Sequence, residues 1–226
     1  MSNNNGFSMQ IMRVIEHIRQ KIETEVFNYT QLTDLLREYS KPRDAISSLM
    51  QKEDIVRIRK GLYVFGTPWR RKPVSREMLA NLVFGPSVVS LDFALSWYGL
   101  IPERVTNLTS TTPERSRHFD TPTGRFSYQH LSHQRFAYGV SIQKNDSGNW
   151  MIAEPLKAIA DKVWLDKRFS PSSPSSYGDY LFEDIRIDES ALEGYINPQK
   201  IIELESVFSA RKVTWLVKFL QRRYFK

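Results

Sequence analysis

The stretch that decides the fold is IVRIRKGLYVF, residues 55–65, in which two short apolar runs flank the triplet RKG at residues 59–61. From Val56 to Arg59, apolar and basic side chains alternate, as they do in a β-strand with one buried face. Gly61 stands where a three-residue hairpin loop needs a left-handed residue. The stretch therefore predicts a β-hairpin with a basic tip.

The pairing of apolar residues supports the same loop. With a loop at residues 59–61, Ile58 faces Leu62 and Val56 faces Val64, so both pairs share one face of the hairpin. A two-residue loop would disrupt that pairing. The parity of the strands and the chemistry of the turn thus predict the same hairpin.

Three short helices are predicted before the hairpin. One covers about residues 8–21, a second starts at an N-cap at Thr30 and ends near Tyr39, and a third is capped by Ser40 with Pro42 in its first turn. Their apolar positions at helical spacing are Ile11, Ile15, Ile18 and Ile22 in the first helix and Leu32, Leu35 and Leu36 in the second. Helix, helix, helix and basic hairpin is the winged helix-turn-helix order, predicted here for residues 8–68.

The third predicted helix has two chemically different sides. Ile46, Leu49 and Met50 lie on one side with Pro42. The residues expected to face outward are Lys41, Asp44, Ser47, Ser48 and Gln51, with Arg43 on the border. Small polar and amide side chains suit a helix in a major groove, where Gln can read adenine. We therefore expect this helix to bind double-stranded DNA; a protein-interaction module with an unused recognition helix is the alternative.

Positive charge is concentrated in the same region. The net charge is +7, and residues 1–75 hold 13 Lys and Arg against 8 Asp and Glu. Arg57, Arg59 and Lys60 on the hairpin are expected to hold phosphates or enter the minor groove. Residues 69–75 read as a basic linker, in which Arg70 and Arg71 are expected to follow the DNA backbone. On charge alone, a solvated basic surface is the competing interpretation.

Residues 76–226 are predicted to form a larger mixed α+β domain. We expect helices near residues 75–83, 90–98 and 154–165, and strands near 105–111, 124–131, 136–143 and 150–152. The chain has no cysteine and no long uncharged apolar run, so we expect a cytoplasmic protein that does not span a membrane.

Three strings carry a family resemblance. They are KGLY at residues 60–63, SLDFALSWYGLIP at residues 90–102 and AEPLKAIAD at residues 153–161. Their order and spacing resemble the AbiEi antitoxin family. That resemblance implies an N-terminal winged helix, a C-terminal antitoxin domain and repression of a shared toxin-antitoxin promoter. It also implies a neighbouring nucleotidyltransferase toxin, neutralised in a type IV mode that need not involve a stable complex.

The sequence lacks the site patterns of the enzymes considered. A restriction-type nuclease needs Asp/Glu-x-Lys beside another carboxylate, and neither Asp-x-Lys nor Glu-x-Lys occurs. There is also no G-x-x-x-x-G-K-[ST], H-E-x-x-H or G-x-S-x-G motif. We expect no catalytic residue, no metal site and no cofactor. The alternative function is a plain winged-helix transcription factor whose C-terminal domain senses a ligand or a protein.

The last predicted helix, residues 211–224, has one apolar and one cationic side. Val213, Leu216, Val217, Leu220 and Tyr224 are expected to pack on the core. Arg211, Trp215, Lys218 and Arg222 fall on the other side and are predicted to bind a partner. Burial of Trp215 beneath residues 201–208 is the alternative. Because one winged helix reads few base pairs, we also expect two copies to occupy an inverted-repeat operator.

Overall fold

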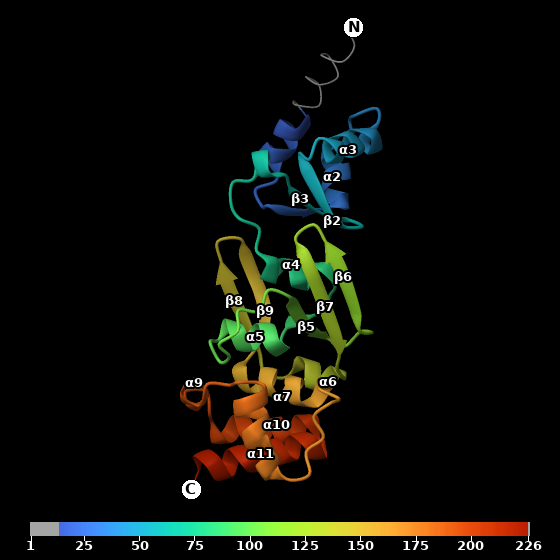
Figure 1. Cartoon of the computed structure of the whole chain (residues 1–226). Helices are drawn as coiled ribbons and strands as arrows, with labels where there is room; N and C mark the ends of the chain where they lie inside the picture. Colours follow the sequence, from blue (N-terminus) through green and yellow to red (C-terminus); the bar gives the residue numbers. More distant parts are fainter. Residues whose placement is uncertain (1–13, 226) are drawn as a thin grey trace.

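The computed structural model describes residues 14–225, and the statements below concern these residues. The chain is a mixed α+β protein, as predicted, with an N-terminal module at one end and its last helices at the other (Figure 1). Residues 8–13 of the first predicted helix lie outside the described residues. Residues 14–21 are helical, and Ile15 and Ile18 are fully buried there.

The N-terminal module, residues 14–68, combines helices with a small antiparallel sheet. Its elements in chain order after residues 14–21 are β1 (Val26–Asn28), α2 (Tyr29–Leu35), α3 (Pro42–Gln51), β2 (Ile55–Arg59), β3 (Leu62–Phe65) and the short 3-10 helix η1 (Thr67–Trp69). Helix η1 ends one residue after the module boundary at residue 68. The strand order in the sheet is β1-β3-β2.

Two helix caps differ from the prediction. Asn28, not Thr30, caps α2: its side chain accepts the Gln31 N–H at 2.9 Å, while the Gln31 side chain accepts the Asn28 N–H at 2.8 Å. This reciprocal box satisfies two backbone donors, which Thr30 inside the helix does not do. Lys41, not Ser40, holds the N-cap position of α3, and Pro42 follows in the first turn as predicted. Helix α2 ends at Leu35, before the predicted end near Tyr39.

The hairpin forms with one change of register. Val56 pairs with Val64 as predicted, and Gly61 has the expected positive φ of 85°. The predicted pairing of Ile58 with Leu62 is wrong, because a β-bulge between Arg57 and Arg59 places Arg59 opposite Leu62. The extra residue in one strand leaves Ile58 unpaired but still buried, with 4% of its surface exposed.

The C-terminal module, residues 76–225, is built on a six-stranded mixed sheet of order β6-β7-β5-β4-β9-β8. Its strands are β4 (Val88–Val89), β5 (Leu108–Thr112), β6 (Arg117–Thr121), β7 (Gly124–His130), β8 (Val140–Asn145) and β9 (Gly148–Ala153). Strands β4 and β6 were not predicted, and Phe136 lies in helix α6 (His133–Ala137) instead of the predicted strand at 136–143. Helix α4 (Arg76–Val83) packs against β4, β5 and β9, and the Tyr128 hydroxyl donates to the Ala80 carbonyl at 2.7 Å.

The remaining helices lie against the lower part of the sheet or beyond it, away from the N-terminal module (Figure 1). They are α5 (Leu91–Trp97), α7 (Pro155–Leu165), α8 (Tyr177–Asp179), the π-helix η3 (Tyr180–Asp184), α9 (Glu189–Glu193), α10 (Pro198–Phe208) and α11 (Arg211–Tyr224), with the 3-10 helix η2 (Pro174–Ser176). Helix α7 contacts α5, α10 and α11 and so connects these layers. Within residues 14–225, no helix combines the length and apolar character needed to cross a bilayer.

A buried polar cluster joins two of the strings that carry the family resemblance. The Lys157 ammonium on α7 donates to both carboxylate oxygens of Asp161, at 2.8 and 2.7 Å, and neither side chain is exposed. The Ser90 hydroxyl, just before α5, donates to the same carboxylate at 2.7 Å. Burial raises the pKa of the Asp161 carboxyl, and its contacts with Lys157 and Ser90 oppose that shift. The cluster fixes the start of α5 against α7.

Both faces of the small N-terminal sheet are buried. Phe27 and Phe65 pack with the helices of their own module. Val26, Ile58 and Val64 belong instead to the buried cluster of the C-terminal module. Figure 1 shows this sheet between α2 and α3 on one side and α4 on the other. The two modules therefore share an apolar interface formed by the sheet.

Candidate nucleic-acid interface

The outer side of α3 is a continuous polar surface. Arg43, Asp44, Ser47 and Gln51 are exposed on it, together with Lys41 at its start. Ser48, predicted to face outward, is only 9% exposed and packs on the inner side near Leu49. The buried side of the helix is wider than predicted, because Ala45 packs against the N-terminal core together with Ile46, Leu49 and Met50.

A hollow between the starts of α2 and α3 extends this surface. It measures about 600 Å³ and is lined by Tyr29, Thr33, Lys41, Pro42, Arg43 and Asp44. Tyr29 is 37% exposed despite its size. Neither Tyr29 nor Thr33 was predicted as a site residue; with an N-cap at Thr30, Tyr29 lies before the predicted helix. The combined surface offers two cations, a carboxylate and several hydroxyl groups at one end of the molecule.

The hairpin cations do not share one environment. Arg57 and Lys60 are exposed, as expected for phosphate contacts. Arg59 is half-buried and turned toward the C-terminal module, where its guanidinium donates to the Val83 carbonyl and lies 5.9 Å from the centre of the Phe119 ring. Arg59 thus differs from Arg57 and Lys60, although all three were predicted to contact DNA.

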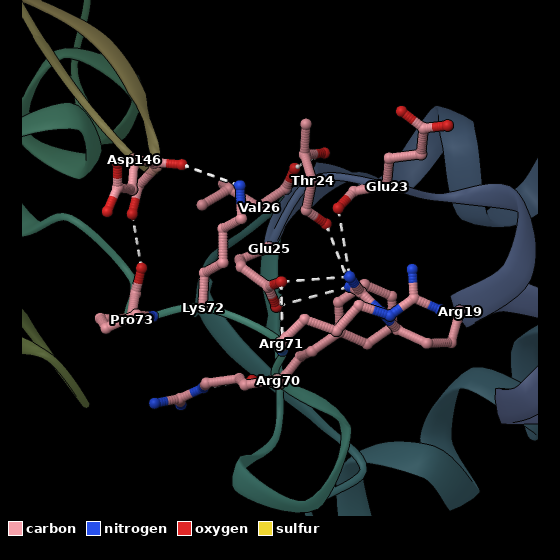
Figure 2. Close-up of polar contacts among 12 residues, drawn as sticks. Arg19, Glu23, Thr24, Glu25, Val26, Arg70, Arg71, Lys72, Pro73 and Asp146 are labelled. Carbon is pink, nitrogen blue, oxygen red and sulfur yellow. Dashed lines mark hydrogen bonds and ion pairs between the residues drawn. The ribbon is translucent and has the colours of Figure 1, made fainter.

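Hydrogen bonds to both modules hold the basic linker at several points (Figure 2). The Arg70 guanidinium donates to the Phe65 carbonyl at 2.7 Å, and the Arg71 N–H donates to the Glu25 carboxylate at 3.2 Å. At the other end, the Ser147 hydroxyl donates to the Pro73 carbonyl at 2.5 Å. The side chains of Arg70 and Arg71 are still largely exposed, so contact with a polyanion stays open to them.

Glu25 also holds a buried arginine, as Figure 2 shows. The Arg19 guanidinium pairs with the Glu25 carboxylate at 3.1 Å, donates to the Glu23 and Thr24 carbonyls, and lies 4.2 Å from the Phe65 ring centre. Burial lowers the pKa of Arg19, and Glu25 opposes that effect. Because all of these contacts are internal, Arg19 stabilises the module and does not belong to the polar surface.

Of the four residues predicted to bind a partner on α11, three are exposed. Val213, Leu216, Val217 and Leu220 are fully buried, as predicted. Arg211, Lys218 and Arg222 are exposed. Trp215 is half-buried against the core, and the Arg211 guanidinium lies 4.2 Å from its ring centre. The exposed part of this side of α11 is therefore mainly cationic.

The C-terminal module also contains a cavity of about 550 Å³ between α5, α7 and η3. Charged groups at its wall include the ion pair Lys162–Asp92, with atoms 2.7 Å apart, and its apolar wall includes Phe169 stacked on Tyr180. Within residues 14–225, no three His, Asp or Glu side chains are grouped to hold a metal ion.

No family model matches the chain, and no curated protein matches it either.

Proposed function

We propose that the chain binds double-stranded DNA in the cytoplasm through the outer side of α3, with the N-terminal module acting as a winged helix-turn-helix. The observation that carries this proposal is the exposed polar side of α3 beside the hollow at α2, on the end of the molecule that the C-terminal module leaves uncovered. The order of helices and strands, with α3 followed directly by the hairpin, supports it. Arg43 and Lys41 are suited to phosphates, and Ser47 and Gln51 to base edges.

The full-length protein is expected to bind a 30-base-pair duplex with a steep dependence on salt. Neutralising about five phosphates gives a slope of about −4 to −5 in a plot of log affinity against log salt concentration. Arg43→Ala should lower affinity for all sequences and reduce the slope by about 0.9. Gln51→Ala should reduce discrimination by about tenfold among duplexes selected from a random pool. Fluorescence anisotropy at several salt concentrations measures both effects.

A charge-matched control separates local contacts from net charge. Arg104 is exposed in the C-terminal module, so Arg104→Ala removes one positive charge away from α3. We expect it to leave the slope unchanged. Equal losses from Arg43→Ala and Arg104→Ala, or no binding at low salt by the folded protein, would reject this DNA-binding surface.

We further propose that the protein represses its own promoter from an inverted repeat and neutralises a nucleotidyltransferase toxin, as the family resemblance implies. The cationic side of α11 supports a protein contact, because no carboxylate among the described residues pairs with Lys218 or Arg222. The competing function is a transcription factor that senses a ligand, and the cavity beside Lys162 supports that alternative. The adjacent reading frame separates them: a nucleotidyltransferase gene favours the antitoxin.

Charge reversal on α11 tests the antitoxin role. Lys218→Glu with Arg222→Glu should abolish protection of cells that co-express the adjacent toxin, because an acidic partner surface would then be repelled. The thermal melt and DNA affinity should stay within about twofold of the unmodified protein, since the sites are far from α3. Trp215 is left in place because it packs on the core. The control is Arg104→Glu with Lys144→Glu, also exposed cations. Full protection by the α11 variant would remove this surface from the mechanism.

A further inference from the structure

We propose that the β2–β3 hairpin couples the two modules and that Arg59 is its positioning residue, instead of a DNA contact. The test by DNA affinity rests on the proposed function. The coupling itself does not, since it consists of contacts within the chain.

The first support is the apolar packing of the sheet. Val26, Ile58 and Val64 are 9%, 4% and 0% exposed, and they lie in the same buried cluster as Leu79 and Val83 of α4. A hairpin that entered a DNA groove would need its tip free of such packing. Here the face that carries Val64 is covered by the second module, so the sheet cannot move without exposing apolar surface.

The second support is the β-bulge at Ile58. Residues directly opposite each other in a sheet share a face, so Arg59 lies on the face of Leu62, while Arg57 lies on the face of Tyr63. In a regular strand, Arg57 and Arg59 would share a face because side chains alternate. Bulges re-aim side chains in this way. The bulge therefore directs Arg59 toward the C-terminal module and leaves Arg57 exposed.

The third support is what Arg59 meets there. Its guanidinium donates to the carbonyl of Val83, the last residue of α4. The final carbonyls of a helix lack partners within it, and a cation is favourable at that end of the helix dipole. The Phe119 ring of β6 lies 5.9 Å from the same guanidinium. Arg59 thus joins the hairpin tip to α4 and to β6.

Amide hydrogen exchange of the full-length protein tests the coupling directly. Arg59→Ala should speed exchange of residues 55–65 and 76–84 by about tenfold, because the hydrogen bond to Val83 is lost. Arg59→Lys, which can still donate to that carbonyl, should restore most of the protection. Lys60→Ala is the matched control at the hairpin tip, because the Lys60 side chain has no hydrogen bond or ion pair with the described residues. It should leave exchange unchanged.

The dependence of DNA affinity on salt gives a second readout, one that a purely structural role of Arg59 would not change. Arg59→Ala should keep the slope of the unmodified protein for the 30-base-pair duplex, whereas loss of a phosphate contact would reduce it by about 0.9. A reduced slope with unchanged hydrogen exchange would overturn the proposal and assign Arg59 to DNA. If the unmodified protein binds no duplex, the proposed function fails, and the exchange of Arg59→Ala alone decides the coupling.

Discussion

Asp161→Ala is expected to destabilise the protein by about 3–5 kcal/mol, because it leaves the Lys157 ammonium buried without its partner. Neither side chain of the pair is exposed, so water cannot replace the carboxylate. The Ser90 hydroxyl loses its acceptor in the same variant. Urea unfolding of the full-length protein, followed by tryptophan fluorescence, measures the loss.

Two further variants show whether burial is the cause. Lys162→Ala removes another ion pair of α7, the one between Lys162 and Asp92. These two side chains are 22% and 39% exposed, so the variant should lose less than about 1 kcal/mol of stability. Lys157→Met with Asp161→Leu removes both buried charges, and we expect most of the lost stability to return, less the cost of the Ser90 hydroxyl without its acceptor. If Asp161→Ala cost no more than Lys162→Ala, the buried pair would not have the role assigned to it.

Gly66→Ala is expected to cost more than about 3 kcal/mol or to unfold the N-terminal module, because an alanine there meets the backbone. A Cβ on Gly66 would lie 1.7 Å from the Glu53 carbonyl oxygen, and neither atom belongs to a flexible side chain. The Gly66 N–H also donates to the Asp54 carbonyl at 2.7 Å, which holds the end of β3 against the turn before β2. Thermal melts and α3 exchange rates measure the effect.

Gly61 provides the matched control, since its constraint is of the opposite kind. Gly66 has a φ of −64°, which any residue adopts, so its cost is steric alone. Gly61 has a φ of 85° with open space around it, so alanine there is limited by conformation, at about 1–2 kcal/mol. Equal effects of the two substitutions would show that the contact with Glu53 relaxes.

The sequence predicts the local features of the fold better than its long-range contacts. Hairpin parity identified the pairing of Val56 with Val64 and the left-handed Gly61, because both depend on neighbouring residues. The bulge at Ile58 was missed, since no local pattern marks it, and Val83, which Arg59 contacts, lies more than twenty residues later in the chain. Strand β4 was missed because two residues are too few to show a period.

The candidate site shows the same division. Helical spacing placed Ser47 and Gln51 on the exposed side of α3 correctly, but it misplaced Ser48, because the width of the buried side depends on the helices packed against it. Charge alone grouped Arg59 with Arg57 and Lys60. Only the three-dimensional contact with Val83 distinguishes them.

The shared sheet has a consequence for synthesis of the chain. Domains generally fold in order as they leave the ribosome. The face with Val26, Ile58 and Val64 is covered by residues that begin with α4, so a nascent N-terminal module carries an uncovered apolar surface until α4 and the strands after it have emerged. Premature termination between residues 66 and 76 would therefore release a fragment with an exposed apolar surface. Such a fragment would be prone to aggregation or degradation and would not act as an isolated DNA-binding module.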